Sequence, residues 1–144
     1  MKYNKPEKWN AIKSSFRRKN NQNTAFEVLQ ELMQKSHINK VLSDMGIDYG
    51  EAKIKIVRDP NLIGGGFLGW TNLNGKEVQL YPDAFASREE LVKTLGHERI
   101  HLEQIKLFGP ARNNSEAVYY EQGPRFSESY WWDEYRRQTD YDGK

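Results

Sequence analysis

The sequence predicts an α+β fold, with helices toward both ends of the chain and a small sheet between them. Apolar residues recur at helical spacing before residue 46 and after residue 87, whereas they alternate with charged residues from Ala52 to Arg58. An Asn74-Gly75 pair follows a Gly-rich stretch, and such residues favour a hairpin and loops. With 144 residues, the chain is expected to form one domain, residues 1–144, with its own hydrophobic core.

Composition restricts the chemistry that the chain can use. It contains no cysteine, which excludes disulfides and thiolate ligands, so any metal must be held by histidines and carboxylates. The net charge of +2 is too small to indicate nucleic-acid binding by itself. We find no secretory signal peptide and no run of transmembrane length, and therefore expect a soluble protein, cytoplasmic or exported by a non-classical route, with no membrane partner.

Residues 1–23 form a basic N-terminal arm. Its lysines and arginines face a single acid, Glu7, while Trp9, Ile12 and Phe16 recur at helical spacing. This pattern predicts that the arm is partly helical and packs on the body of the protein through its apolar residues. An arm that binds nucleic acid is the alternative interpretation.

Two more helices are predicted before the sheet. The run from Thr24 to Glu27 has the pattern of a capping box and precedes an apolar stripe, which predicts a core-facing helix to about Lys35. Ser36 is predicted to cap a second, short helix that ends at Gly46. His37 lies at the start of this helix, where a lone histidine is more often a capping or surface residue than a metal ligand.

Strands are predicted between residues 52 and 81. Alternation over residues 52–58 predicts a strand with one exposed face. Phe67 to Thr71 and Glu77 to Tyr81 are predicted to form a hairpin around a tight primed turn at Asn74-Gly75, which gives a small, mainly antiparallel sheet. A phosphate loop requires a lysine and a helix after its glycines, and residues 64–66 have neither. These glycines either allow close contact between the backbone and a peptide or simply form a loop.

The run His97-Glu98-Arg99-Ile100-His101 carries the clearest chemical signal. Ser87 and Glu90 form a capping box before it and Gly109-Pro110 ends the predicted helix after about 21 residues. On one face of a helix, histidines four residues apart can hold one metal ion, and the glutamate between them can take a proton from bound water. The alternative is a helix whose two surface histidines have this spacing by chance.

The third ligand is expected to be a carboxylate, because the chain has no cysteine and no histidine after His101. The candidates are Glu116, Glu121 and Glu128. Tyr119 to Gln122 is predicted to be helical, which places Glu121 on a helix. Gly123-Pro124 is predicted to break that helix, which would turn Glu128 away from the face of Glu121.

The order of these elements, together with the histidine motif, resembles the zincin metallopeptidase fold. A carboxylate as third ligand points to gluzincins, and the thermolysin-like members place this glutamate roughly twenty residues after the second histidine, which favours Glu121. Zincins bind an extended peptide along the edge of the sheet. The resemblance implies that Val78, Gln79 and Leu80 form this edge, or else their hairpin partner, Phe67 to Thr71.

The run from Thr94 to Gly109 also resembles the metallopeptidase domains of bacterial polymorphic toxins and of phage or mobile-element proteins. The similarity extends from about residue 66 to residue 132. It implies a zinc ion, a peptide or protein substrate, an inhibitory or immunity protein as partner, and a bacterial or phage origin. The residues that it implies are His97 and His101 as ligands and Glu98 as general base.

Two charged residues depart from the zincin pattern. Arg99 stands where zincins prefer an uncharged residue, and Glu103 stands where they favour an apolar one; the two can pair at i, i+4 on the helix.

Two alternatives to a zinc metallopeptidase are retained. One is a catalytically idle metal-binding module with a structural or interaction role, and the other is a nucleic-acid-binding protein that uses the basic arm.

Overall fold

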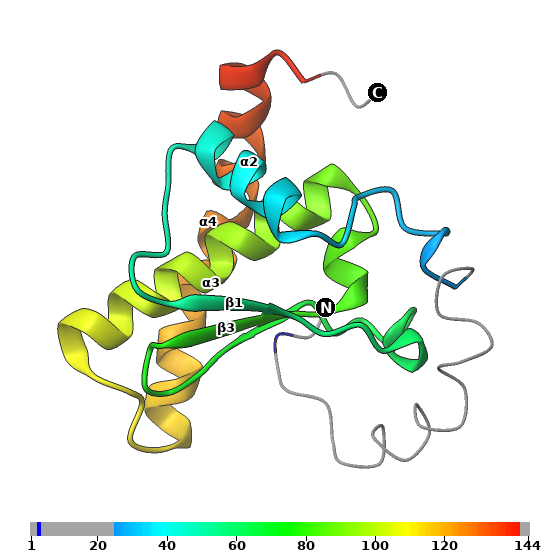
Figure 1. Cartoon of the computed structure of the whole chain (residues 1–144). Coiled ribbons are helices and arrows are strands. Elements are labelled where there is room, and N and C mark those ends of the chain that lie inside the picture. Colours follow the sequence, from blue (N-terminus) through cyan, green and yellow to red (C-terminus); the bar gives the residue numbers. More distant parts are fainter. Residues whose placement is uncertain (1–2, 4–24, 142–144) are drawn as a thin grey trace.

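The structure is a computed structural model that describes residue 3 and residues 25–141 (Figure 1). It is α+β, as predicted. Its longest helices are α2 (Lys35–Met45), α3 (Arg88–Phe108) and α4 (Asn114–Thr139), and they accompany a three-stranded sheet. Apart from Tyr3, the basic arm of residues 1–23 lies outside the described residues. Within the described part of the chain, none of the helices combines the length and apolar character needed to cross a membrane.

The sheet is mixed, and the prediction of a mainly antiparallel sheet is wrong. Its central strand is β3 (Glu77–Leu80), which pairs in parallel with β1 (Lys53–Ile56) and antiparallel with β2 (Gly69–Thr71). The chain leaves β1 through the short 3-10 helix η1 (Pro60–Leu62) and enters the sheet again on the far side of β3. This crossover makes β1 and β3 run in the same direction.

The strand order also corrects the predicted peptide-binding edge. Val78, Gln79 and Leu80 belong to the central strand and are buried, so the expectation that they form an edge is wrong. The alternative, β2, does lie at an edge of the sheet.

The hairpin between β2 and β3 is confirmed, but its turn is longer than predicted. The Asn72 amide donates to the Glu77 carbonyl at 2.8 Å, so residues 73–76 form the loop. Gly75 has a φ of 71°, whereas Asn74 is not in the left-handed region. A two-residue primed turn of the predicted kind, with positive φ at both central residues, is therefore not formed.

Residues 25–34 do not form the predicted core-facing helix down to Lys35. The Glu31 amide instead donates to the Phe85 carbonyl at 3.0 Å, so this stretch runs along another segment of backbone. The Glu31 carboxylate is buried and accepts hydrogen bonds from Arg88 and, at 2.8 Å, from His37 Nε2. Long-range contacts of this kind outweigh a local helical pattern and cannot be recognised from it.

Helix α2 ends as predicted but begins differently. Gly46 follows it with a φ of 73°, and its amide caps the last turn. Gln34 precedes the helix and provides no side-chain cap, so the prediction that Ser36 is the capping residue is wrong. The buried face of α2 consists of Ile38, Val41, Leu42 and Met45.

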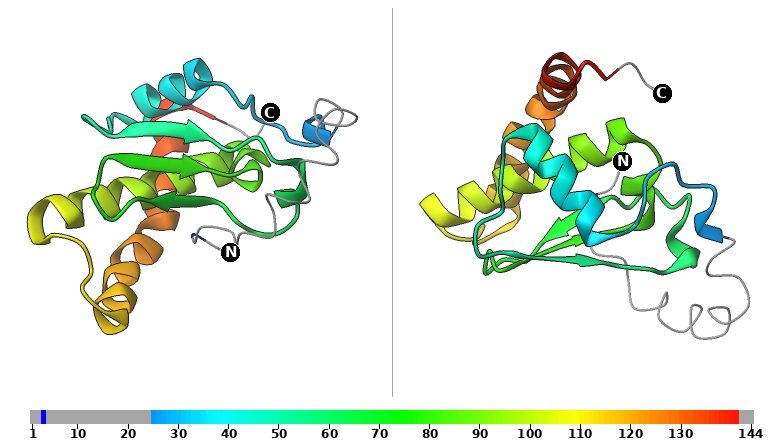
Figure 2. Two further views of the ribbon diagram at one scale, coloured as in Figure 1. Left: turned by 60° about the horizontal axis from the view of Figure 1, so that its bottom comes forward. Right: turned by 45° about the horizontal axis from the view of Figure 1, so that its top comes forward.

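The helices lie together on one side of the sheet (Figure 2). Helix α3 packs against both β2 and α4 and thereby connects the sheet to the last helix. A Cβ atom at Gly96 would overlap the indole of Trp131, so the glycine permits the close approach of α3 and α4. The core includes Ile38, Val41, Val78, Leu80, Phe85, Leu91 and Leu95.

Candidate metal centre

Helix α3 has the bounds that the sequence predicts. The Ser87 hydroxyl accepts a hydrogen bond from the Glu90 amide at 3.1 Å, and the Gly109 amide donates to the Ile105 carbonyl at 2.8 Å. The N-terminal half of the helix is buried in the core up to Glu98. The histidine motif therefore begins where α3 leaves the core, on a helix that is fixed at both ends.

Helix α4 continues through Pro124, and the prediction of a break at Gly123-Pro124 is wrong. Asn113 caps the helix by accepting a hydrogen bond from the Glu116 amide at 2.9 Å. Because the helix is continuous, Glu121 and Glu128 are seven residues apart on one face. Both of these carboxylates reach His97 on α3.

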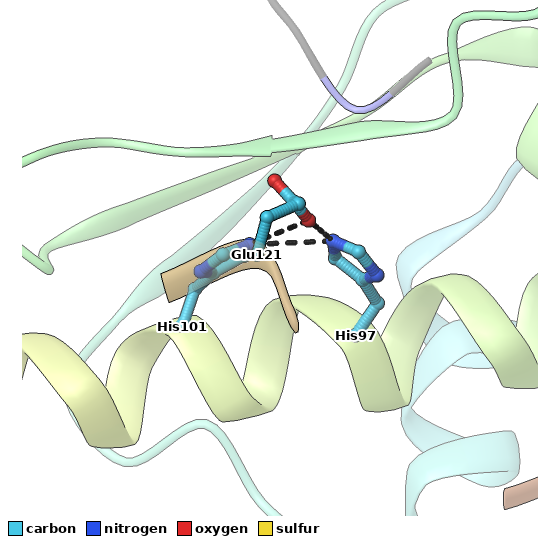
Figure 3. A group of neighbouring side chains, drawn as sticks. All are labelled: His97, His101 and Glu121. Carbon is cyan, nitrogen blue, oxygen red and sulfur yellow. Dashed lines mark hydrogen bonds and ion pairs between the residues drawn. The ribbon is translucent and has the colours of Figure 1, made fainter. Parts of the chain in front are cut away.

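Three ligand atoms converge between the two helices (Figure 3). His101 Nε2 lies 3.2 Å from His97 Nε2 and 3.2 Å from Glu121 Oε1, and Glu121 Oε1 also forms an ion pair with His97 Nε2. His97 is completely buried, whereas His101 and Glu121 are half-buried. Three such atoms that converge from two helices could hold a metal ion.

Two of the three separations between these atoms fit zinc, whereas His97 Nε2 and Glu121 Oε1 form a direct ion pair and lie closer together. Zinc binds histidine nitrogen and carboxylate oxygen at 2.0 to 2.2 Å, and tetrahedral geometry then separates two ligand atoms by about 3.3 Å. The two separations of 3.2 Å that involve His101 Nε2 agree with this value. Two histidines and one glutamate form a known donor set for catalytic zinc, which leaves a fourth position for water or substrate.

The other two candidate glutamates have different surroundings. Glu128 Oε2 lies 2.9 Å from Nδ1 of His97, the nitrogen that faces away from Glu121. Since a carboxylate only accepts, Nδ1 of His97 carries the proton, and Glu128 orients this ring. Glu116 instead pairs with Arg112 at 2.7 Å, and the structure does not bring it to the histidines.

The charges of the centre shift its pKa values. Burial lowers the pKa of His97, but hydrogen bonds to Glu121 and Glu128, together with the charge of Glu98, outweigh this effect and raise it to about 9. Burial raises the pKa of Glu121, but its contacts with His101 and His97 have the larger combined effect and hold it well below its usual range. In the metal-free protein, the proton on His97 therefore supplies positive charge next to the Glu121 carboxylate.

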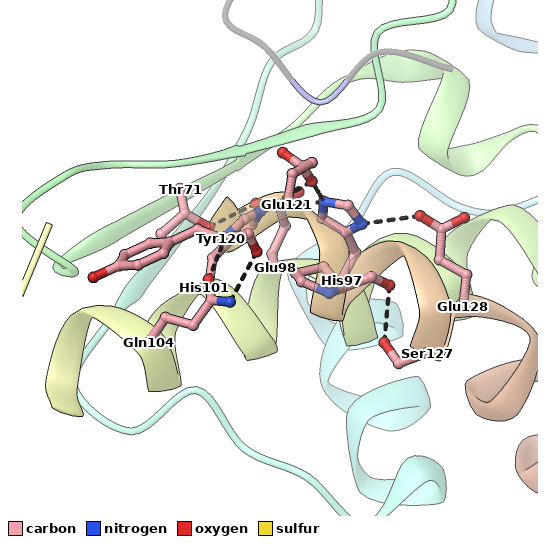
Figure 4. A network of polar contacts seen from close by, with 10 residues as sticks. Thr71, His97, Glu98, His101, Gln104, Tyr120, Glu121, Ser127 and Glu128 are labelled. Atoms are coloured by element: carbon pink, nitrogen blue, oxygen red, sulfur yellow. Dashed lines mark hydrogen bonds and ion pairs between the residues drawn. The ribbon is translucent and has the colours of Figure 1, made fainter. Parts of the chain in front are cut away.

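Glu98 lies completely buried beside the histidines (Figure 4). Its Oε1 accepts a hydrogen bond from the Thr71 hydroxyl at 2.6 Å, while Oε2 has no hydrogen-bond partner among the described residues. A Cβ atom at Gly69 would lie 2.9 Å from this free oxygen, so glycine makes room for the carboxylate. Burial raises the pKa of Glu98 to about 7, against the lowering effect of the two histidines and Thr71.

A small pocket adjoins Glu98 and His101. It has a volume of about 160 Å³ and is lined by the β2 edge, α3 and α4, with Trp70, Leu73 and Ile105 among its apolar residues. Tyr3 belongs to the same lining, and its ring stacks on His97 with centroids 3.6 Å apart. A larger pocket of about 520 Å³ elsewhere on α3 is lined by neither histidine.

Arg99 and Glu103, which depart from the zincin pattern, do not disturb the centre. They form the i, i+4 pair that their spacing predicts, at 2.8 Å, and the Arg99 Nε also donates to the Asp48 carbonyl at 2.9 Å.

Three residues that contact the centre were not identified from the sequence. Each makes its contact between elements that are distant in the chain, and the spacing of residues in the sequence does not show such contacts. These residues are Tyr3, Gly69 and Thr71.

Comparison of the chain with protein-family models, with curated proteins and with solved structures found no match.

Proposed function

We propose that this protein is a zinc-dependent metallopeptidase of the gluzincin type. One observation carries the proposal, namely that Nε2 of His97, Nε2 of His101 and Oε1 of Glu121 converge beside the buried carboxylate of Glu98. The small pocket next to these residues and the position of β2 at an edge of the sheet support a peptide as substrate.

In the proposed reaction, His97, His101 and Glu121 hold the metal and Glu98 transfers protons. A zinc ion held by these residues would supply Lewis acidity toward the attacking water and toward the carbonyl of the scissile amide. Glu98 accepts the proton of the attacking water and returns it to the leaving amine. In the metal-free protein, burial raises the pKa of Glu98 to about 7, and the charge of a bound zinc ion would lower it again toward the carboxylate form that accepts a proton.

A catalytically idle metal-binding module is the second candidate, and the burial of Glu98 favours it. The carboxylate has no exposed surface, and Tyr3 covers one face of the neighbouring His97 ring. A substrate would have to displace Tyr3 or enter through the small pocket to reach Glu98. In this alternative, zinc would stabilise the contact between α3 and α4, and no peptide would be cleaved.

Metal content and turnover together test the proposal. Protein purified without a metal-binding tag should contain near-stoichiometric zinc by elemental mass spectrometry, and His97→Ala and Glu121→Ala should each lose it. Glu98→Gln should keep zinc and reduce cleavage of a peptide library by about 10² to 10⁴-fold, the usual contribution of a general base. Zinc without any cleavage would favour the idle module, and the absence of zinc after supplementation would refute both.

The resemblance of the motif to toxin metallopeptidase domains supports a role as a toxin or effector domain, with an inhibitory or immunity protein as partner. Expression in the bacterial cytoplasm should then slow growth, and Glu98→Gln should remove this effect while leaving the amount of protein unchanged. Equal growth with the wild-type protein and with Glu98→Gln would contradict the toxin role without affecting the proposed peptidase activity.

A further inference from the structure

Gln104 connects the two helices of the metal centre (Figure 4). It lies on α3 one turn after His101, and its amide contacts two groups. Nε2 of Gln104 donates to the Tyr120 carbonyl of α4 at 2.8 Å, and Oε1 lies 3.0 Å from Nδ1 of His101. The side chain thus joins a histidine of the centre to the backbone of the helix that carries Glu121.

The Tyr120 carbonyl needs this partner because of Pro124. In an α-helix the carbonyl of residue 120 accepts from the amide of residue 124, but proline has no N–H to donate. A carbonyl can only accept, so the nitrogen of the Gln104 amide must face Tyr120. The oxygen of the same amide is thereby turned toward His101.

This orientation favours a proton on Nδ1 of His101. The Gln104 oxygen accepts, so Nδ1 of His101 must be the donor. Nε2 of His101 lies 3.2 Å from both His97 Nε2 and Glu121 Oε1, so it also faces an acceptor. Glu121 Oε1 already pairs with His97 Nε2, however, so a neutral His101 ring with its proton on Nδ1 keeps its lone pair on Nε2. Glu128 does the same for Nδ1 of His97 from the other side of the centre.

We propose that Gln104 is a positioning residue that holds His101 in the Nδ1–H tautomer, so that its Nε2 lone pair points to the metal position. The assignment of this lone pair to a metal rests on the proposed function, whereas the tautomer itself does not. Without Gln104, His101 Nε2–H would donate to Glu121 Oε1, and the ring would lose the form in which it binds metal.

Nitrogen-15 NMR of the histidine side chains in the metal-free protein tests the proposal without any activity measurement. In the wild-type protein, at a pH where the ring is neutral, His101 should carry its proton on Nδ1. Gln104→Met has a similar length but no hydrogen bonds, and should move the proton to Nε2. Gln122→Met is the matched control, because Gln122 is exposed on α4, and it should leave His101 unchanged.

Gln104→Glu distinguishes the effect of Gln104 on the His101 ring from its effect on the contact between α3 and α4. The carboxylate can accept from His101 Nδ1 but cannot donate to the Tyr120 carbonyl, so the Nδ1–H tautomer should persist. We further expect zinc affinity to fall about 10 to 100-fold in Gln104→Met, as is usual when the partner of a ligating histidine is removed. Gln104→Glu should keep affinity closer to wild type.

Two results would overturn the proposal. One is a wild-type His101 with its proton on Nε2, and the other is a Gln104→Met protein that folds and retains the proton on Nδ1. The two proposals can fail separately. If His101 has the expected Nδ1–H tautomer but neither the wild-type protein nor any variant binds zinc, the metallopeptidase proposal fails and the role of Gln104 in orienting His101 stands.

Discussion

Removal of Glu128 should weaken zinc binding although Glu128 is not expected to touch the metal. Its Oε2 lies 2.9 Å from Nδ1 of His97, a ring with no exposed surface, and the Glu128 side chain is only 18% exposed. A hydrogen bond to a charged group is worth about 1.5 to 3 kcal/mol. Loss of the carboxylate that orients a ligating histidine typically costs about 10 to 100-fold in affinity, or roughly 1.4 to 2.8 kcal/mol.

We therefore expect Glu128→Ala to raise the dissociation constant for zinc about 10 to 100-fold. Glu128→Gln should have a smaller effect, because an amide oxygen can still accept from Nδ1–H but carries no charge. The assay is zinc titration against a chromogenic chelator of known affinity, which reports the free metal directly. Circular dichroism of each variant shows whether α4 has remained folded.

Glu116→Ala is the matched control for Glu128→Ala. Glu116 lies on the same helix and the substitution removes the same charge, but its partner is Arg112 and not a histidine. The affinity of this variant should equal that of the wild type. Equal affinities for Glu128→Ala and Glu116→Ala would refute the role of Glu128, and a loss as complete as that of Glu121→Ala would identify Glu128 as a ligand.

Three further predictions concern the surroundings of the centre. Thr71→Val should lower turnover about 10 to 100-fold at unchanged zinc content, and Thr71→Ser should restore it; equal rates in both variants would contradict the role of the hydroxyl. Gly96→Ala should destabilise the protein by about 1 to 3 kcal/mol in urea denaturation, because the added methyl group overlaps Trp131. Metal-free protein should lose stability between pH 6.5 and 9, because the pKa of His97 is raised from 6.5 to about 9 and the folded state binds a proton that the unfolded chain releases. The loss has an upper limit of about 3 kcal/mol, and a thermal midpoint that does not fall over this range would contradict it.

The part of the centre that could be predicted lies on a single helix. Ser87 and Gly109 delimit α3 through hydrogen bonds to residues three or four positions away, so its bounds depend on local sequence alone. Within such a helix, the number of residues between two positions determines whether their side chains lie on the same face. His97, Glu98 and His101 could for this reason be placed together before any tertiary contact was known.

The role of Glu128 could not be predicted, because it depends on how α4 continues through Pro124. The proline removes one helical hydrogen bond, and reading the sequence locally assumes that nothing replaces it. Gln104 replaces it from another helix, at 2.8 Å from the Tyr120 carbonyl. The partner of the Tyr120 carbonyl is thus a residue twenty positions before Pro124, and local reading of the sequence could not identify it.

The contact between β2 and Glu98 could not be predicted either, for a similar reason. Alternation of apolar and charged residues identifies strands, but it does not say on which side of β3 each strand lies. The crossover after β1 places β2 at the edge beside α3, and only this order brings Thr71 within 2.6 Å of Glu98.

The histidine motif and the residues that hydrogen-bond to it consequently have different roles in the proposed centre. In the proposed centre, the histidine motif supplies the two ring nitrogens and the general base, whereas Gln104, Glu128 and Thr71 make the hydrogen bonds that orient His101, His97 and Glu98. A chain that kept the motif but lost these three partners would still form a capped helix with two histidines on one face. Its rings and carboxylate would lose the hydrogen bonds that orient them, and we would expect weaker zinc binding and little turnover, because a catalytic group must be held close to its productive geometry. An H-E-x-x-H sequence is therefore a stronger sign of catalysis when the acceptors for both Nδ1 atoms can also be identified.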